Sequence, residues 1–361
     1  MSALDGSARR SAGTGLSAPR GLPEADRLPV AKGHGTQNDF VLLPDPDGRL
    51  DVTPAFVAAL CDRRAGLGGD GLIRVVRSAA LPEGAALAGD AEWFMDYRNG
   101  DGSDAQMCGN GIRVFVTYLR HLGLVDLADG ASLSVGTRTG VLSVRRDGDL
   151  LAADLGPWRV VGGEAAVEAG HDATVEVRGI EVNGATVVLP GLCVDVGTPH
   201  TVLALAGADM LGSADLTTAP VVSPAPVRGT NVELTVPLHE TGAGVGHLRM
   251  RVHERGVGET RSCGTGAAAA VLATRAWAGP SAPRTWQVDV AGGRLRVTVP
   301  ADDVTAGPGV ELAGPATIVA EGHLDAAWLD AVRSAVEAPR GAAGGRGARP
   351  LTRDDATTRR A

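Results

Sequence analysis

Two cysteines stand in matching sequence frames, one in each half of this 361-residue chain. Cys108 lies in SDAQMCGNGIRVF (103–115), and Cys263 lies in GETRSCGTGAAAA (258–270). In both frames an acidic residue stands four positions before the cysteine, Gly-x-Gly follows it, and a run suited to a helix comes next. The pattern therefore predicts two thiols placed at the starts of two helices.

A cysteine at the start of a helix is suited to act as a thiolate, because unpaired backbone N–H groups and the helix dipole stabilise negative charge there. The glycines let the backbone come close to a ligand, and its amides can bind an anion. A lone free cysteine is more often a small buried hydrophobe. We interpret Cys61 and Cys193 in that way, whereas the paired frames favour a chemical role for Cys108 and Cys263.

Two thiols on opposite sides of one carbon can invert its configuration. One thiolate removes a proton, and the opposite thiol returns a proton to the other face. Many enzymes stabilise the resulting carbanion with pyridoxal phosphate, which needs a Schiff-base lysine. Only Lys32, in KGHGTQNDF, could serve, so we expect no cofactor and, instead, two helix N-termini converging on the substrate carboxylate. The cysteine and histidine spacings match neither a zinc site nor a redox dithiol, so we expect no metal.

The elements that must position these thiols are mostly short strands. TPAFVAALCDRRAG predicts a helix with Thr53 as N-cap, Pro54 at its first position and Gly66 near its end. Two more helices are expected directly after Cys108 and Cys263. Strand-like runs are DFVLLPD, LIRVVRSA, LSVRR, LLAADL, TVEVRGIEV, VELTVPL, LRMRVHE and QVDVAGGRLRVTVP. Strands with one principal helix per half predict an α+β protein of two similar halves.

The glycine-rich segment GLGGDG (66–71) fits the dinucleotide-binding pattern G-x-G-x-x-G. A dinucleotide site needs a strand before these glycines and a helix after them, whereas here the predicted order is reversed. We therefore interpret this segment as a turn.

Composition excludes several classes of protein. The net charge of −8 argues against a nucleic-acid binder. The chain contains no uninterrupted apolar run long enough to span a membrane, and its N-terminal residues lack the apolar core of a secretory signal. Four cysteines are too few for a disulfide scaffold in a chain of this length, so we expect a cytoplasmic protein. Segments 1–27 and 337–361 lack apolar periodicity and are predicted to be disordered tails.

The ordered motifs resemble the diaminopimelate epimerases. The matching segments occur in the order known for that family: KGHGTQNDF, CDRRAGLGGDG, YRNGDGSDAQMCGNG, VGTPH, GTNVE and HERGVGETRSCGTG. The resemblance implies two pseudo-symmetric halves, each a barrel-like β-rich sheet around a central helix, with the active site in the cleft between them. It places the first half at 28–150, completed by a return strand at 309–322, and the second half at 151–308.

The resemblance also implies a reaction and a site. The reaction is cofactor-independent epimerisation of LL-2,6-diaminopimelate to the meso form, a step toward lysine and peptidoglycan precursors. It makes Cys108 and Cys263 the two acid–base thiols, and His200 and Glu254 match residues close to the reacting carbon. The positions that match substrate-binding residues are Asn38, Asn99, Gly109, Asn110, Thr198, Asn231, Glu254, Arg255, Gly264 and Thr265.

Elementary chemistry agrees with this set, because a substrate with two amino-acid ends needs both acceptors and donors. Asn side chains supply either, and Arg255 offers a bidentate fork for the distal carboxylate. Taken singly, the Asn residues suit turns and Glu254–Arg255 suits a solvated ion pair. Asp104 and Glu259, each four positions before a cysteine, are interpreted as loop supports.

One position departs from the family. Thr198 stands where the family usually has the Asn of Gly-Asn-Pro-His, so a hydroxyl replaces an amide. Two alternatives stay open: a proline or hydroxyproline racemase of the same superfamily, and a catalytically inactive binding module. The racemases typically carry His after the first Cys-Gly, where this chain has Asn110. The resemblance further implies a homodimer with a small-molecule substrate and neither a nucleic-acid nor a membrane partner.

Overall fold

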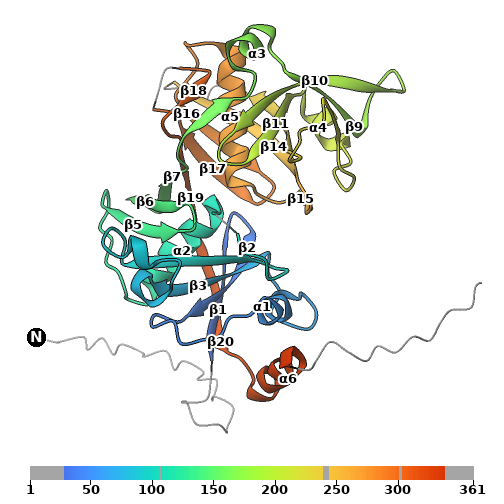
Figure 1. Ribbon diagram of the computed structural model, residues 1–361. Helices are drawn as coiled ribbons and strands as arrows, with labels where there is room; N and C mark the ends of the chain where they lie inside the picture. The colour runs from blue at the N-terminus through green and yellow to red at the C-terminus, as the bar shows by residue number, and fades with distance from the viewer. Residues whose placement is uncertain (1–27, 106, 239–243, 301–302, 338–361) are drawn as a thin grey trace, which may run out of the picture.

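The computed structural model describes residues 28–337, apart from residue 106 and segments 239–243 and 301–302. The predicted tail 1–27 lies outside the described residues, as does the predicted tail at 337–361 beyond its first residue. Two β-rich bodies stack one above the other, and each contains one long helix (Figure 1). The predicted α+β architecture of two similar halves is confirmed.

The sheet of the first half forms from eight strands that pair in a fixed order. In order of pairing, these strands are β20 (Thr317–His323), β1 (Pro29–Gly35), β2 (Asn38–Pro44), β3 (Gly71–Arg77), β4 (Trp93–Asn99), β5 (Ser132–Thr137), β6 (Gly140–Asp147) and β7 (Leu150–Asp154). The β2–β3 and β4–β5 pairs are parallel, and the others are antiparallel. Parallel neighbours need a crossover, and helices α1 (Pro54–Cys61) and α2 (Gly109–His121) lie in these two crossovers.

The second half repeats this topology. In order of pairing, its main strands are β10 (Ala185–Asp195), β11 (Pro199–Ala204), β13 (Asn231–Leu238), β14 (Val245–Glu254), β16 (Thr285–Val290), β17 (Gly293–Thr298) and β19 (Glu311–Gly314). Its parallel pairs are β11–β13 and β14–β16, and helices α4 (Ala208–Ser213) and α5 (Gly264–Ala278) lie in the crossovers. Matching positions on matching strands can therefore supply equivalent residues to one site.

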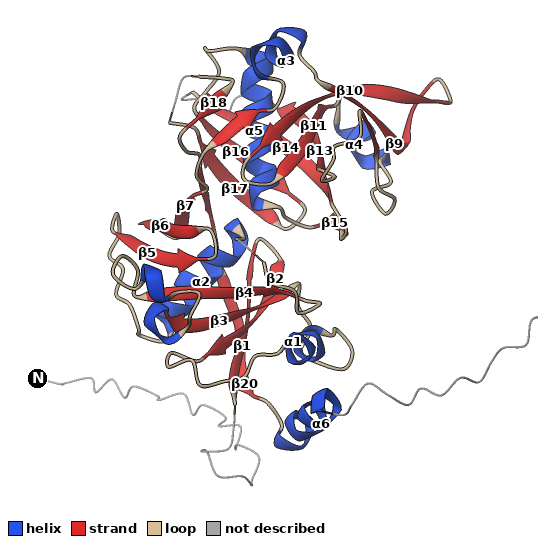
Figure 2. Ribbon diagram, in the orientation of Figure 1, coloured by secondary structure: helices blue, strands red, loops and turns tan. Residues whose placement is uncertain are grey.

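Several short elements complete the described chain. They are β8 (Trp158–Val160), α3 (Gly163–Ala169), β9 (Ala173–Val182), β12 (Val221–Ser223), β15 (Gly258–Thr260), β18 (Ala306–Gly307) and the 3₁₀ helices Ser78–Ala80 and Ala85–Leu87. Every predicted strand run overlaps at least one strand (Figure 2), and QVDVAGGRLRVTVP covers most of β16, all of β17 and the turn between them. The run LIRVVRSA stops being a strand at Arg77, because the first of the 3₁₀ helices begins at the next residue.

One continuous line of strand pairs joins the two halves. Strand β19 pairs with β17 of the second half and with β7 of the first half, and both pairings are antiparallel. The chain then continues into β20, which pairs with β1. The predicted boundary between the halves, after residue 150, falls within β7. The position of that boundary stays a prediction.

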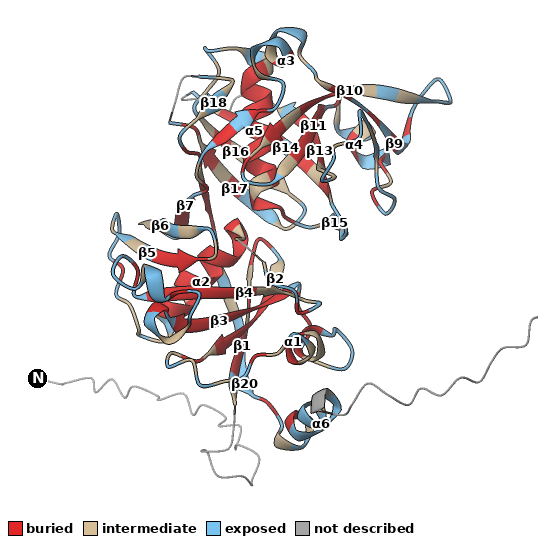
Figure 3. Ribbon diagram, in the orientation of Figure 1, coloured by how far each residue is buried: buried red, intermediate tan, exposed pale blue. Residues whose placement is uncertain are grey.

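The two long helices form the centres of their halves. Helix α2 packs against strands β1, β2, β3, β4, β6, β7, β19 and β20, and α5 packs against β10, β11, β13, β14, β16, β17 and β19. The run Ala267–Ala273 of α5 is buried on every side of the helix (Figure 3). A helix that is apolar all round is buried all round, and its small side chains let the sheet close tightly around it.

Helix α1 begins as predicted and ends early. Thr53 caps it by accepting from the Phe56 amide at 3.2 Å, and Pro54 is its first residue. The helix ends at Cys61, short of Gly66, because the Asp62 carboxylate binds the next two free amides. A Cβ at Gly66 would lie 2.1 Å from the Ala59 carbonyl oxygen, so the predicted glycine-rich turn folds back on the helix.

Helix α6 (Ala326–Glu337) was not expected from the sequence. Asp325 caps it by accepting from the Trp328 amide at 3.1 Å. The Trp328 indole donates to the Ala65 carbonyl at 3.0 Å, and buried Leu329 joins the core formed with α1. The helix therefore covers α1, on the side of the first half that faces away from α5 (Figure 1).

Candidate active site

Each of the two paired cysteines is the N-cap of a central helix, as predicted. Cys108 precedes α2 and accepts from the Gly111 amide at 3.3 Å. Cys263 precedes α5 and accepts from the Gly266 amide at 3.3 Å. Both sulfur atoms thus lie on free helix N–H groups, where negative charge is stabilised.

The two helix starts touch each other. A Cβ added to Gly264 would lie 3.5 Å from the Cα of Gly109 and 2.7 Å from Cδ2 of Leu312. A Cβ added to Gly109 would lie 3.0 Å from the same Leu312 atom. Glycine at both positions leaves room for the Leu312 side chain beside the two helix starts, and two sets of amides and two positive helix ends converge on one region.

Asn110 joins the two halves at this point. Its side-chain amide donates to the Ser262 carbonyl at 3.2 Å and is 3.3 Å from both the Ser262 hydroxyl and Asn38 Oδ1. Its side-chain carbonyl oxygen, Oδ1, accepts from Arg113 Nη2 at 2.9 Å. A second link across the halves joins the Thr36 and Ser262 hydroxyls at 2.6 Å.

In the first half, Asn38 faces the Cys108 thiol. The thiol lies 3.5 Å from Asn38 Oδ1, and Asn38 Nδ2 donates to Asp70 at 2.7 Å. Arg63 holds Asp70 through a 2.6 Å ion pair. Because Asp70 only accepts, it fixes the amide orientation and turns the Asn38 carbonyl oxygen toward the sulfur.

Asn99 makes its side-chain hydrogen bond inside a turn. It ends β4, its Nδ2 donates to the Ser103 hydroxyl at 3.0 Å, and its backbone amide donates to the Ser103 carbonyl at 2.9 Å. The structure therefore brings Asn99 to the loop before Cys108 and gives it a turn contact.

In the second half, a buried carboxylate lies behind His200. The Glu233 carboxylate is 2.7 Å from His200 Nδ1, and both side chains are fully buried. His200 Nε2 lies 2.9 Å from the Thr198 hydroxyl, which is 3.3 Å from the Thr265 hydroxyl. Thr265 in turn lies 3.6 Å from Cys263 Sγ. Thr198, His200 and Thr265 thus converge on the second thiol.

Sequence reasoning missed Glu233. It alternates with apolar residues in VELTVPL, the pattern of a strand with one solvated face. In the structure the apolar side of β13 packs against β9 and α4, while Glu233 faces α5: a Cβ at Gly266 would lie 2.7 Å from its carboxylate. The available signal was its place two residues after Asn231, on the same face of the strand.

Glu254 and Arg255 end β14 beside the site. The Glu254 carboxylate accepts from the Thr260 hydroxyl. The Arg255 amide donates to Asn231 Oδ1 at 2.9 Å, while its exposed guanidinium binds the Arg228 carbonyl. The structure therefore brings Asn231 and Arg255 together, with the exposed guanidinium held at the Arg228 carbonyl.

The electrostatics of the site favour neutral thiols before substrate binds. Burial raises the pKa of the Cys108 thiol to about 11. Burial raises the pKa of the Cys263 thiol well above its ordinary value, and the charges of Glu254 and Glu233 raise it further. Burial also raises the pKa of Glu254 itself, whose charge acts on both thiols.

The repeated topology relates the site residues in pairs. In the parallel β2–β3 pair Phe40 lies opposite Gly71, and in the parallel β11–β13 pair His200 lies opposite Asn231. Two residues before Phe40 and His200 stand Asn38 and Thr198, which are therefore equivalent. Asn99 and Glu254 end the equivalent strands β4 and β14.

Asp104 and Glu259 pair with arginines. Asp104 lies 3.3 Å from Arg98, on a β-bridge that fixes the loop before Cys108. Glu259 lies on β15 and binds Arg251 through two contacts of 2.7 and 2.9 Å. Both acids hold the segments that lead to the cysteines, as interpreted from the sequence.

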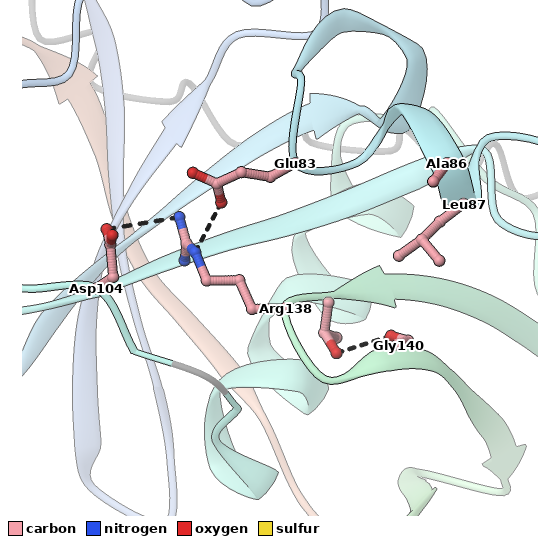
Figure 4. Close-up of a pocket in the computed structure, with 7 residues that line it drawn as sticks. Glu83, Ala86, Leu87, Asp104, Arg138 and Gly140 are labelled. Carbon is pink, nitrogen blue, oxygen red and sulfur yellow. Dashed lines mark hydrogen bonds and ion pairs between the residues drawn. The ribbon is translucent and has the colours of Figure 1, made fainter.

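A surface pocket of about 420 Å³ lies near this loop (Figure 4). It is lined by Glu83, Ala86, Leu87, Asp104, Thr137, Arg138 and Gly140. Arg138 is held there by Asp96 at 2.6 Å and by Glu83 at 2.7 Å. None of the predicted site residues lines this pocket, and its arginine is already neutralised by carboxylates.

No group of three or more His, Cys, Asp or Glu residues within the described ranges could hold a metal ion. No helix in that part of the chain is long and apolar enough to cross a membrane.

Comparisons with known proteins place this geometry in context. Residues 30–161 and 192–319 match the family described as diaminopimelate epimerase. A diaminopimelate epimerase from Streptomyces coelicolor is 49% identical over 85% of this chain and 98% of its own length. One from Thermobifida fusca is 46% identical over 81% of this chain and 97% of its own length.

Solved structures share the fold at low identity. A phenazine biosynthesis protein of the PhzF family from Bacillus anthracis is 16% identical, with a TM-score of 0.59, over 83% of this chain and 99% of its own. A hydroxyproline epimerase from Agrobacterium vitis is 12% identical, with a TM-score of 0.50, over 83% of this chain and 91% of its own. These two likenesses concern the fold alone.

Proposed function

This chain belongs to the diaminopimelate epimerase family, and we propose that it interconverts LL- and meso-2,6-diaminopimelate with Cys108 and Cys263 as its two bases. The observation that supports this most strongly is the pair of cysteine N-caps on two helices whose starts touch at Gly109 and Gly264. The product is a precursor of lysine and of peptidoglycan. The reaction requires no cofactor, because the helix ends supply the electrostatic stabilisation.

The chemical step balances with one proton taken and one given. One thiolate removes the Cα proton and becomes a thiol, while the opposite thiol donates its proton to the other face of the carbon. Between these transfers, negative charge spreads onto the substrate carboxylate. The free amides at Gly109, Asn110, Gly264 and Thr265 are preorganised to hold that carboxylate, the type of electrostatic stabilisation that lowers enzymatic barriers most.

For the reaction to begin, one of the two neutral thiols must lose its proton once the substrate is bound. The substrate ammonium brings a positive charge next to Glu254, whose negative charge raises the pKa of both thiols in the empty site. Neutralising Glu254 in this way makes either thiol easier to ionise. We propose that Glu254 and His200 control proton transfer between the thiols and the reacting carbon.

The remaining polar residues bind the two ends of the substrate. Asn38 begins β2, Asn99 ends β4 and Thr198 directly precedes β11, while Asn231 lies beside Arg255. The exposed Arg255 guanidinium can pair with the distal carboxylate, which distinguishes a long diacid from proline.

The assembly and location of the protein belong to the same proposal. We expect a cytoplasmic homodimer with a small-molecule substrate and neither a nucleic-acid nor a membrane partner. Analytical ultracentrifugation of the purified chain across a range of concentrations tests the dimer, and a monomer at all concentrations would contradict it.

The activity is tested by incubating the purified chain with LL-diaminopimelate in D₂O and a reductant. We expect the meso isomer, with deuterium at one Cα, and no racemisation of L-proline or hydroxyproline in parallel reactions. Cys108→Ala and Cys263→Ala should each abolish epimerisation. Racemised proline with unchanged diaminopimelate would support the proline racemase alternative, and no reaction with any substrate would support an inactive binding module.

A further inference from the structure

A line of hydrogen-bonding groups runs from the second thiol into the protein interior. Cys263 Sγ lies 3.6 Å from the Thr265 hydroxyl, which lies 3.3 Å from the Thr198 hydroxyl. Thr198 lies 2.9 Å from His200 Nε2, and His200 Nδ1 lies 2.7 Å from Glu233. All members of the line come from the second half, from β11, β13, the start of α5 and the loop before β11.

The directions of these contacts suit proton movement. The Thr198 hydroxyl is placed to donate to Thr265. This direction belongs to the protonated imidazole, in which Nε2–H donates to Thr198 and Nδ1–H donates to the Glu233 carboxylate. To take up a proton, His200 Nε2 must be unprotonated and accept from Thr198, and both hydroxyls must turn to donate in the opposite direction. Each hydroxyl both accepts and donates through one oxygen, so the two threonines connect the imidazole to the sulfur without a gap.

The buried thiol needs a proton acceptor. Cys263 must lose a proton when it acts as the base, yet burial and the charges of Glu254 and Glu233 hold the pKa of its thiol well above the ordinary value. No basic group lies in direct hydrogen-bond contact with its sulfur among the described residues. An imidazole backed by a buried carboxylate, two hydroxyls away, is the nearest acceptor that the hydrogen bonds connect.

We propose that Thr198 and Thr265 form a hydroxyl relay that passes a proton between Cys263 and His200, with Glu233 as the positioning residue for His200. The inference rests on the proposed role of Cys263 as a base. When Cys263 loses its proton, that proton goes to Thr265, the proton of Thr265 goes to Thr198, and the proton of Thr198 goes to His200 Nε2. The products are one thiolate and one imidazolium, both hydroxyls are restored, and the return path reverses each transfer.

The groups around His200 support this direction. Glu233 on β13 contacts its ring, and Glu254 on β14 is the other carboxylate close enough for its charge to interact with His200. The start of α5 brings Cys263 to the far end of the relay. Two carboxylates, those of Glu233 and Glu254, therefore lie near the imidazole that ends the relay.

The first half lacks the relay. In the repeated topology, Phe40 occupies the position of His200, and Ile73 occupies that of Glu233. Asn38, the equivalent of Thr198, contacts the Cys108 thiol directly. The two thiols therefore have different hydrogen-bond partners. In the second half, Thr198, the residue that departs from the family pattern, connects His200 to Thr265.

The test removes one hydroxyl at a time and measures kcat and KM in both directions as a function of pH. Thr198→Val keeps the branched shape and breaks the relay, so we expect kcat to fall about 100-fold near neutral pH, the low end of the range for lost acid–base assistance. The loss should shrink as pH rises, because hydroxide then removes the proton. KM is expected to rise as well, because Thr198 is also proposed to bind substrate, so the fall in kcat is the decisive readout. Thr198→Ser should restore kcat because it keeps the hydroxyl.

Two further variants make the result decisive. Thr265→Val breaks the next link, so Thr198→Val and Thr265→Val combined should lower kcat no further than either alone. Thr201→Val is the matched control: its hydroxyl contacts Cys193 and Thr230, outside the relay, and kcat should not change.

The relay is overturned by an unchanged kcat in Thr198→Val, by a raised KM with unchanged kcat, or by additive losses in the double variant. If Thr198→Val does not fold, Thr265→Val alone decides through the same pH profile. Absence of epimerisation by the unaltered protein in this assay would instead overturn the proposed function.

Discussion

Replacing Asn110 should loosen the junction of the two halves. In Asn110→Leu, which has a similar volume, Arg113 Nη2 loses its 2.9 Å acceptor and the Ser262 carbonyl loses its 3.2 Å donor. Arg113 is fully buried and bonds otherwise only to the Gly109 carbonyl among the described residues, and its Nε has no partner there. Burial lowers the pKa of this guanidinium to about 10.

The expected loss follows from these two contacts. A buried hydrogen bond to a charged group contributes about 1.5–3 kcal/mol, and an orphaned buried carbonyl costs about 1–3 kcal/mol. Their sum is about 2.5–6 kcal/mol, a large part of the roughly 5–15 kcal/mol that stabilises a typical protein.

The assay is urea unfolding followed by circular dichroism, with kcat/KM measured on the folded variant. Asn110→Asp is the comparison variant: it keeps an acceptor for Arg113, adds a negative charge that pairs with that guanidinium, and loses the donor to Ser262 and Asn38, so it should lose less stability than Asn110→Leu. A free energy of unfolding within about 1 kcal/mol of the native value in Asn110→Leu would refute the reasoning, because that is below the cost of one orphaned group.

Three other predictions follow from the geometry of the site. The thiolate fraction of Cys108 should rise about tenfold per pH unit up to its pKa near 11. The logarithm of its alkylation rate, followed by peptide mass spectrometry, should therefore rise with a slope of about one against pH. A plateau near neutral pH would contradict this. Glu254→Gln should speed alkylation of Cys108 and Cys263 at fixed pH while lowering kcat, since its charge raises the pKa of both thiols; unchanged alkylation rates would exclude that influence. Gly264→Ala places a Cβ 2.7 Å from Leu312 Cδ2 and should lower kcat/KM about tenfold or more by shifting one helix start, a result that unaltered kinetics would rule out.

The part of the site that could be predicted from the sequence is the part set by local rules. Capping by Cys108 and Cys263 follows from residue types next to a helix, and the helix starts were placed correctly for that reason. Strand runs were found through their β-branched residues and period. The start of α1 followed from Thr53 and Pro54, whereas its end depended on the Asp62 side chain, which binds the next two amides.

The parts that were missed depend on contacts between distant segments. Glu233 reads as a solvent-facing residue because its strand alternates, and only the helix packed on that face makes it buried. The contact between Thr198 and Thr265 joins residues far apart in the chain, so spacing could not reveal it. Helix α6 carried a capping signal in Asp325, but its stability depends on docking against α1.

The most direct test of the two-thiol reaction follows the Cα proton during the first few per cent of conversion of LL-diaminopimelate in D₂O. With one thiol on each face, the meso product should carry solvent deuterium at the inverted carbon while the recovered LL substrate stays protonated. Product that keeps the substrate proton, or recovered substrate that gains deuterium at the same rate as product forms, would show that a single base serves both faces and would contradict the assignment of Cys108 and Cys263.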